Sequence, residues 1–142
     1  MSWLAAALDG EGSIVVCRIK TNGNTAYTLE LSLANTVLMF CERAEEFSDV
    51  GRINRQGLLW RWRCTRQNEL VELLPRIIPY LQMKKEKAEV LYYIAKLRLG
   101  KKYLPPKERP WTDVEKQIAE MLVSNPRRPV KSKLRRRDLT SH

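Results

Sequence analysis

A stretch near the N-terminus constrains the fold of this chain more than any other feature. Residues 4–8 read Leu-Ala-Ala-Ala-Leu, and Asp-Gly-Glu-Gly follows at residues 9–12. A short helix that is apolar on all sides has to be buried on all sides. Ala6 and Gly10 lie four residues apart on one helix face, where small side chains let a second helix backbone come close. The stretch therefore predicts a buried helix with a small-residue face for another helix.

The residues that end this helix carry its chemistry. The two glycines predict the end of the helix and leave Glu11 at its C-terminus. Unpaired carbonyls make that end partially negative, so a carboxylate there is unfavourable unless a cation is bound. Glu11 and the backbone carbonyl of Gly10 form a hard-oxygen site suited to Mg2+, and Mn2+ or Ca2+ could occupy the same site. From the residues alone, a buried helix with a glycine cap and a solvated acid fits equally well.

The whole chain limits the class of protein. Its 142 residues suffice for one domain with a real core, no apolar run could span a membrane, and the N-terminus does not read as a signal peptide. Cys17, Cys41 and Cys64 have no CxxC spacing, which predicts buried free thiols in a reducing compartment, either a bacterial or phage-host cytoplasm or an organelle matrix. The only histidine is His142, which excludes histidine-based nucleases, catalytic triads and zinc hydrolases.

The charge of the chain predicts a polyanionic partner. The formal net charge is +10. Seven Arg or Lys residues lie between residues 127 and 137, so residues 127–142, with Asp138, supply +6 and residues 1–126 only +4. A basic run of this kind is typical of a disordered arm that binds nucleic acid without sequence preference. Specific recognition is therefore expected from the folded part.

Alternating apolar residues predict four strands in two hairpins. The first hairpin turns at an Asn-Gly pair, and the second contains the sequence Trp-Arg-Trp-Arg. The predicted strands are residues 13–20, 27–34, 51–57 and 58–65.

Helical periodicity accounts for most of the remaining chain. A capping box, Thr112 with Glu115, opens the last helix, whose predicted buried stripe is Val114, Ile118, Met121 and Leu122. Pro75 and Pro79 predict a kink or a break in the helix that contains them. The earlier predicted helices are residues 38–48, 67–81 and 83–99. We expect residues 1–104 to form the core, 105–126 a helical extension and 127–142 a disordered tail.

The two hairpins are expected to form one antiparallel sheet whose other face is open to a ligand. Between Asp49 and Glu69 there are five arginines and no acid, whereas a solvated strand normally mixes charge signs. Such a face can make hydrogen bonds to base edges in the major groove of DNA. The residues predicted on it are Arg18, Lys20, Thr28, Glu30, Ser32, Arg52, Asn54, Gln56, Arg61 and Arg63.

Residues 4–14 resemble the signature of the LAGLIDADG homing endonucleases. The matching positions are Leu4, Ala5, Asp9, Glu11 and Gly12, and Ala7 departs from the pattern. Asn35-Thr36, Gly51-Arg52-Ile53, the Trp-Arg-Trp-Arg strand and residues 78–89 also look like family positions, so the resemblance covers about residues 3–99. It implies an α+β fold of the order αββαββα, with a saddle-shaped antiparallel sheet laid along DNA and helices on its other face.

The resemblance also implies roles for single residues. Glu11 would bind the catalytic metal, Asn35 would position water, and Lys84 would help to activate the attacking water. Asp9 reads as a structural residue at the helix base rather than a metal ligand.

One motif acid per chain predicts a homodimer that brings two Glu11 carboxylates together on its axis. The predicted dimer interface is Leu4, Ala5, Ala6, Leu8, Asp9 and Gly10. The expected function is a double-strand break at a specific DNA site by metal-dependent phosphodiester hydrolysis. Two alternatives stay open, an intron RNA maturase and a noncatalytic DNA-binding protein on the same scaffold.

Overall fold

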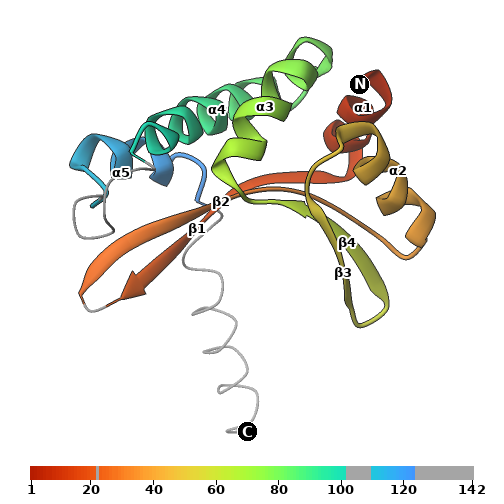
Figure 1. Cartoon of the computed structure of the whole chain (residues 1–142), viewed down its shortest axis with the longest axis horizontal. Helices are drawn as coiled ribbons and strands as arrows, with labels where there is room; N and C mark the ends of the chain where they lie inside the picture. Colours follow the sequence, from red (N-terminus) through yellow and green to blue (C-terminus); the bar gives the residue numbers. More distant parts are fainter. Residues whose placement is uncertain (22, 102–109, 124–142) are drawn as a thin grey trace, which may run out of the picture.

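The computed structural model describes residues 1–21, 23–101 and 110–123. The fold is α+β, with a four-stranded antiparallel sheet bent into a saddle and helices over its convex face (Figure 1). The strands are β1 (Gly12–Thr21), β2 (Asn24–Asn35), β3 (Arg52–Gln56) and β4 (Leu59–Cys64), in the order β1-β2-β4-β3. The helices are α1 (Ser2–Glu11), α2 (Leu38–Ser48), α3 (Gln67–Ile77), α4 (Lys85–Leu99) and α5 (Asp113–Glu120), with a 3-10 turn η1 (Ile78–Tyr80).

The pairing register decides which side chains the helices cover. Val16 lies opposite Leu29, and Leu33 lies opposite Trp62. All four side chains are buried beneath the helices, because directly paired residues of antiparallel strands point to the same face. The residues between them point to the open concave face, which Figure 1 shows facing away from the helices.

The register corrects the predicted face of two residues. Arg18 lies opposite Tyr27 and Lys20 opposite Thr25, in phase with the buried Val16. Both therefore lie on the helix-side face, and the prediction that they share the open face with Thr28 is wrong. Both faces of this strand carry apolar residues, so its alternation could not say which face the helices cover. Arg18 instead forms an ion pair with Glu120 of α5.

Helix α5 braces the first hairpin from above. Its capping box is present as predicted, with the Glu115 N–H donating to Thr112 Oγ1 at 3.2 Å. The predicted buried stripe is wrong at Val114, which is 61% exposed, and at Met121, which is 70% exposed. The helix is rotated so that Glu115 turns inward and pairs with Arg98 and Lys101. Ala119 and Leu122 supply the apolar contacts.

The helix that contains both prolines breaks at the second one. α3 runs through Pro75, and Pro79 falls in the first positions of the separate 3-10 turn. The chain then bends, and α4 begins at Lys85 rather than at residue 83.

The three cysteines are free, as predicted, although Cys17 is exposed rather than buried. Burial raises the pKa of Cys64 to about 12, so this thiol is inert. Within the described residues, no helix combines the length and apolarity needed to span a bilayer. The predictions for residues 105–109 and 124–142, among them the basic tail, lie outside the described residues.

Candidate active site and nucleic-acid interface

Glu11 lies where α1 passes directly into β1. Gly12 caps the helix in an extended conformation and donates its N–H to the Leu8 carbonyl. A Cβ at Gly12 would lie 2.7 Å from the Leu8 backbone, so only glycine permits this close turn. The junction holds the Glu11 carboxylate, an exposed group, at the C-terminal end of the helix.

Asn35 meets Glu11 from the end of β2. Its Nδ2 donates to Glu11 Oε2 at 3.2 Å, and its Oδ1 accepts the Val37 N–H at 2.8 Å. The backbone contact therefore fixes the orientation of the amide that holds the acid. Asn35 is the only hydrogen-bond or ion-pair partner of the Glu11 side chain in the part of the chain that the structure describes. The second carboxylate oxygen is thus available to a cation.

Asp9 and Lys84 fasten α1 to α4. The Asp9 carboxylate accepts the backbone N–H groups of Gln82, Met83 and Lys84 at 2.8, 3.1 and 3.0 Å. In return, Lys84 Nζ donates to the Asp9 carbonyl at 2.7 Å. Asp9 thus places a negative group just before the N-terminus of α4, and Lys84 places a cation at the C-terminal end of α1.

The titration of Asp9 agrees with this structural role. Burial would raise the pKa of its carboxyl, but the three N–H donors and the Lys84 charge outweigh burial and lower it. The structure thus joins Asn35 to Glu11 but joins Lys84 to Asp9, two residues before the acid.

The oxygen donors at the end of α1 are of the kind that could hold a metal ion, but they are few. Glu11 and the carbonyl end of α1 are hard oxygen donors, the type that Mg2+ prefers. Among residues 1–21, 23–101 and 110–123, however, no three His, Cys, Asp or Glu side chains gather as a metal-binding group.

Fewer residues of α1 are exposed to a partner than the predicted dimer interface requires. Leu4, Ala5 and Leu8 are fully buried in the chain's own core, so these three predicted interface residues are not available to a partner. Ala6 and Gly10 are exposed, and a Cβ at Gly10 would meet no atom within 4 Å. The expectation of a helix buried on every side is therefore not met within one chain.

The open face of the sheet carries its cations on β3 and β4. Arg52 pairs with Arg63 and Asn54 with Arg61 in the register, so all four share that face. Arg61 Nε donates to Gln56 Oε1 at 3.0 Å, and Arg63 Nε lies 3.0 Å from Glu30 Oε1. Glu30 also accepts from Ser32 Oγ at 3.3 Å. Thr28 lies on the same face, on β2, opposite Cys17.

Sequence reasoning missed two residues beside this face. Arg66 and Thr65 follow β4 directly and border a hollow together with Arg52 and Arg63. Arg66 belongs to the acid-free run of five arginines, which was the available signal. It was missed because it lies at the start of α3, outside the strand alternation that selected the other residues.

Solved structures share this fold, although the sequence matches no protein-family profile and no curated protein. The archaeal intron-encoded homing endonuclease I-Vdi141I, complexed with DNA, is 17% identical with a TM-score of 0.70, over 84% of this chain and 79% of that chain. The homing endonuclease I-CvuI, in complex with a DNA target in the presence of magnesium, is 18% identical with a TM-score of 0.65, over 72% and 69%.

A third structure with this fold is a LAGLIDADG meganuclease. The LAGLIDADG meganuclease I-AabMI, bound to uncleaved DNA, is 20% identical with a TM-score of 0.60, over 75% of this chain and 40% of that chain. The chain therefore has the α+β fold of the LAGLIDADG homing endonucleases, and the resemblance seen in residues 4–14 extends to the whole architecture.

Proposed function

We propose that this protein is a homodimeric, divalent-metal-dependent DNA endonuclease that makes a double-strand break at a specific site. The observation that carries the proposal is the pairing of Glu11 with Asn35 at the base of α1. An exposed carboxylate, oriented by a neutral amide, stands next to a helix face on which Ala6 and Gly10 are exposed. Binding DNA without cutting it requires neither the acid nor its amide partner.

The metal would be held by Glu11 and by carbonyl oxygen at the end of α1, with Gly10 as the nearest candidate. A divalent ion there supplies charge neutralisation and a positioned water for phosphodiester hydrolysis. Asn35 would orient the acid and hydrogen-bond to that water. Lys84 places positive charge at the same helix end through its bond to the Asp9 carbonyl, so it would lower the local negative potential where the phosphate arrives.

The dimer would form through the outer face of α1. Trp3, Ala6 and Gly10 lie at positions i, i+3 and i+7, one face of a helix. Beside this face, Trp3, Val37 and Met39 border a shallow apolar hollow that includes Asn35. A twofold axis through this face would bring the two Glu11 carboxylates together, so that one site addresses both DNA strands.

Recognition would come from the open face and affinity from the basic C-terminal run. Asn54, Gln56, Arg61 and Thr28 lie on strands and can reach base edges in a major groove. Residues 127–142, which supply +6 of the net charge, would contact phosphates on any sequence.

The test is selection of cleaved sites from a library of randomised duplex DNA in Mg2+. We expect the wild-type protein to cut both strands at one preferred sequence and to lose cutting when Mg2+ is replaced by EDTA. Glu11→Gln serves as the matched control, since it keeps the shape and removes the charge. Absence of cutting with any duplex, or equal cutting by Glu11→Gln, would refute the proposal. Specific capture of folded RNA in place of DNA would favour a maturase.

A further inference from the structure

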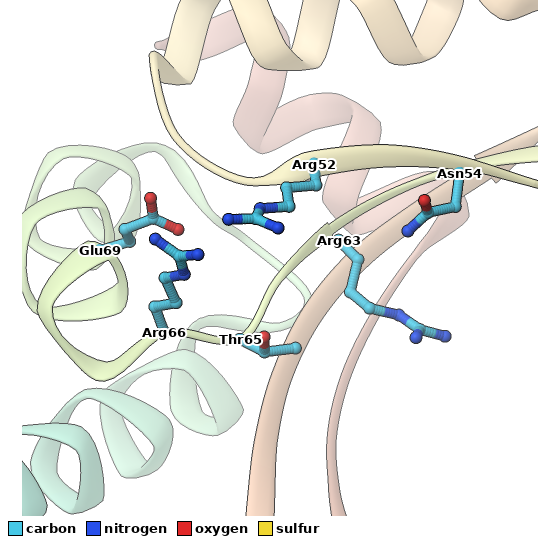
Figure 2. Close-up of a pocket in the computed structure, with 6 residues that line it drawn as sticks. All are labelled: Arg52, Asn54, Arg63, Thr65, Arg66 and Glu69. Carbon is cyan, nitrogen blue, oxygen red and sulfur yellow. The ribbon is translucent and has the colours of Figure 1, made fainter.

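A hollow of about 130 Å³ opens where the β3–β4 hairpin meets the start of α3. Its lining comes from three elements, with Arg52 and Asn54 on β3, Arg63 on β4, and Thr65, Arg66 and Glu69 at the turn into α3 and in its first turn. Figure 2 shows Arg52 and Arg66 pointing toward one another beside Glu69, while the guanidinium of Arg63 points away. Two positive groups therefore converge on one small space.

The two converging guanidiniums have no counter-ion of their own. Neither the Arg52 nor the Arg66 side chain makes a hydrogen bond or an ion pair within the described residues. Glu69 is the one acid in the lining, and it forms no ion pair with either of them. Its Oε1 instead accepts the Gly51 N–H at 3.4 Å, which ties it to the start of β3. Arg63 is neutralised by Glu30.

We propose that this hollow binds a single phosphate of the DNA backbone, held between Arg52 and Arg66. The inference rests on the proposed DNA-binding function and adds a positioning site to it. Like charges that face one another are unfavourable until an anion lies between them. Guanidinium groups match phosphate oxygens with two parallel hydrogen bonds each, and the hydroxyl of Thr65 adds a further donor.

The geometry favours a phosphate over a base edge. A base edge presents at most two acceptors in one plane, which a single arginine satisfies. Two guanidiniums approaching from different elements suit a group with oxygens on several sides. β3 is an edge strand, so the hollow lies at the rim of the sheet, where a backbone rather than a groove floor would pass.

Salt dependence of binding tests the proposal without requiring cleavage. The probes are several short duplexes of unrelated sequence, and the variants are Arg52→Ala, Arg66→Ala and their double mutant. Each single variant should weaken binding on every duplex and lower the slope of log affinity against log salt by up to about one. The affinity gap to wild type should shrink about threefold between 50 and 200 mM salt.

The double mutant tests whether the two arginines hold the same phosphate. If both arginines hold the same phosphate, the double mutant lowers the slope by about one in total, not by two. Arg66 provides no side-chain cap to α3, so its replacement leaves the start of the helix intact. Arg76→Ala is the matched control, because Arg76 lies on the same helix but pairs with Glu72 away from the hollow. It should leave the slope unchanged.

Glu69→Gln supplies a change of opposite sign. Removing this charge from the lining should tighten binding on all duplexes. An unchanged slope in both arginine variants, or a changed preference among sequences with no change in slope, would overturn the phosphate site. A slope loss of two in the double mutant would overturn the shared phosphate. None of these results touches the cleavage assay, so failure of this inference and failure of the proposed function are distinguishable.

Discussion

The two hairpins of the sheet present different surfaces to a ligand. The open face of β1–β2 consists largely of neutral side chains, among them Val15, Cys17, Ile19, Ala26 and Thr28. The open face of β3–β4 carries Arg52, Arg61 and Arg63, with Arg66 beside it. Two hairpins of one sheet, joined through the β2–β4 pairing, thus differ in charge on the same surface.

The difference teaches how the molecule divides its tasks. The base of β1–β2 holds Glu11 and Asn35, and α5 braces this hairpin through Glu120, which binds Arg18 and the Tyr27 hydroxyl. The cations of this hairpin are thus turned toward its own helices. On β3–β4, Arg52 and Arg61 face the open side with no ion pair within the described residues, whereas Arg63 pairs with Glu30. Under the proposed function, the β1–β2 hairpin would position the catalytic acid, and recognition would come from the β3–β4 hairpin.

Glu11→Gln should separate the two tasks most strongly. Loss of the charge should abolish metal binding and lower cleavage by orders of magnitude, because no second acid joins Glu11 within the described chain. DNA affinity without metal should stay the same or rise slightly, since one negative charge near a phosphate is removed. Measuring the cleavage rate and the DNA affinity of the same variant tests whether Glu11 acts in cleavage and not in binding. A variant that cuts normally would take Glu11 out of the mechanism.

Gly10→Leu should prevent dimerisation without lowering the stability of the fold. A side chain at Gly10 meets no atom of its own chain within 4 Å, and leucine favours a helix by about 1 kcal/mol over glycine. The melting temperature should therefore hold or rise while sedimentation shows a monomer and cleavage is lost. Gly12→Ala is the contrasting variant, since its Cβ would lie 2.7 Å from Leu8 and destabilise the fold. An active Gly10→Leu dimer would contradict the interface.

Deleting residues 127–142 should weaken binding to all sequences alike. The deletion removes seven cations and one acid, so the slope of affinity against salt should flatten. The preferred site should not change, because phosphate contacts carry no sequence information. Affinities for the selected site and for scrambled duplexes over a salt series provide the measurement. A new preferred site would place recognition in the tail.

Arg61→Ala should relax discrimination at particular base pairs. Arg61 lies on the open face of the cationic hairpin and is held by Gln56. Its loss should cost about 1–3 kcal/mol of discrimination against the wrong base, with a small effect on the salt slope. Thr28→Ala on the neutral hairpin is the comparison and should cost less. Equal losses from both would mean that the charge difference between the hairpins does not matter for recognition.

Glu120→Gln should change stability the least. It tests the contacts of Glu120 with Arg18 and Tyr27, which tie α5 to the β1–β2 hairpin. The hydrogen bonds from Arg18 and Tyr27 lower the pKa of Glu120. A carboxyl whose pKa is lower in the folded state stabilises the fold above its ordinary pKa, and this contribution is lost as pH falls through the folded value. The melting temperatures of wild type and Glu120→Gln should therefore differ slightly at neutral pH and converge in acid. A difference in melting temperature that stays constant with pH would contradict a stabilising role for the Glu120 carboxylate.

The sequence by itself determined the helix that ends at Glu11, both hairpins and the capping box at Thr112. These features depend on local preferences, such as glycine at a helix end and alternation in a strand. The resemblance in residues 4–14 also predicted the whole fold, which the structure confirms. The open-face positions of Arg52, Asn54, Arg61 and Arg63 followed correctly from the same alternation.

Only the tertiary structure decided which face of β1 the helices cover, and with it the position of Arg18. Strand alternation defines two faces but not their surroundings, and both faces of β1 are apolar enough to be buried. The inward turn of Glu115 and the pairing of Asp9 with Lys84 join residues 17 and 75 positions apart. Arg66 lies in the same hollow as Arg52 because α3 begins just after β4 ends. Such contacts depend on how elements pack, which no local pattern contains.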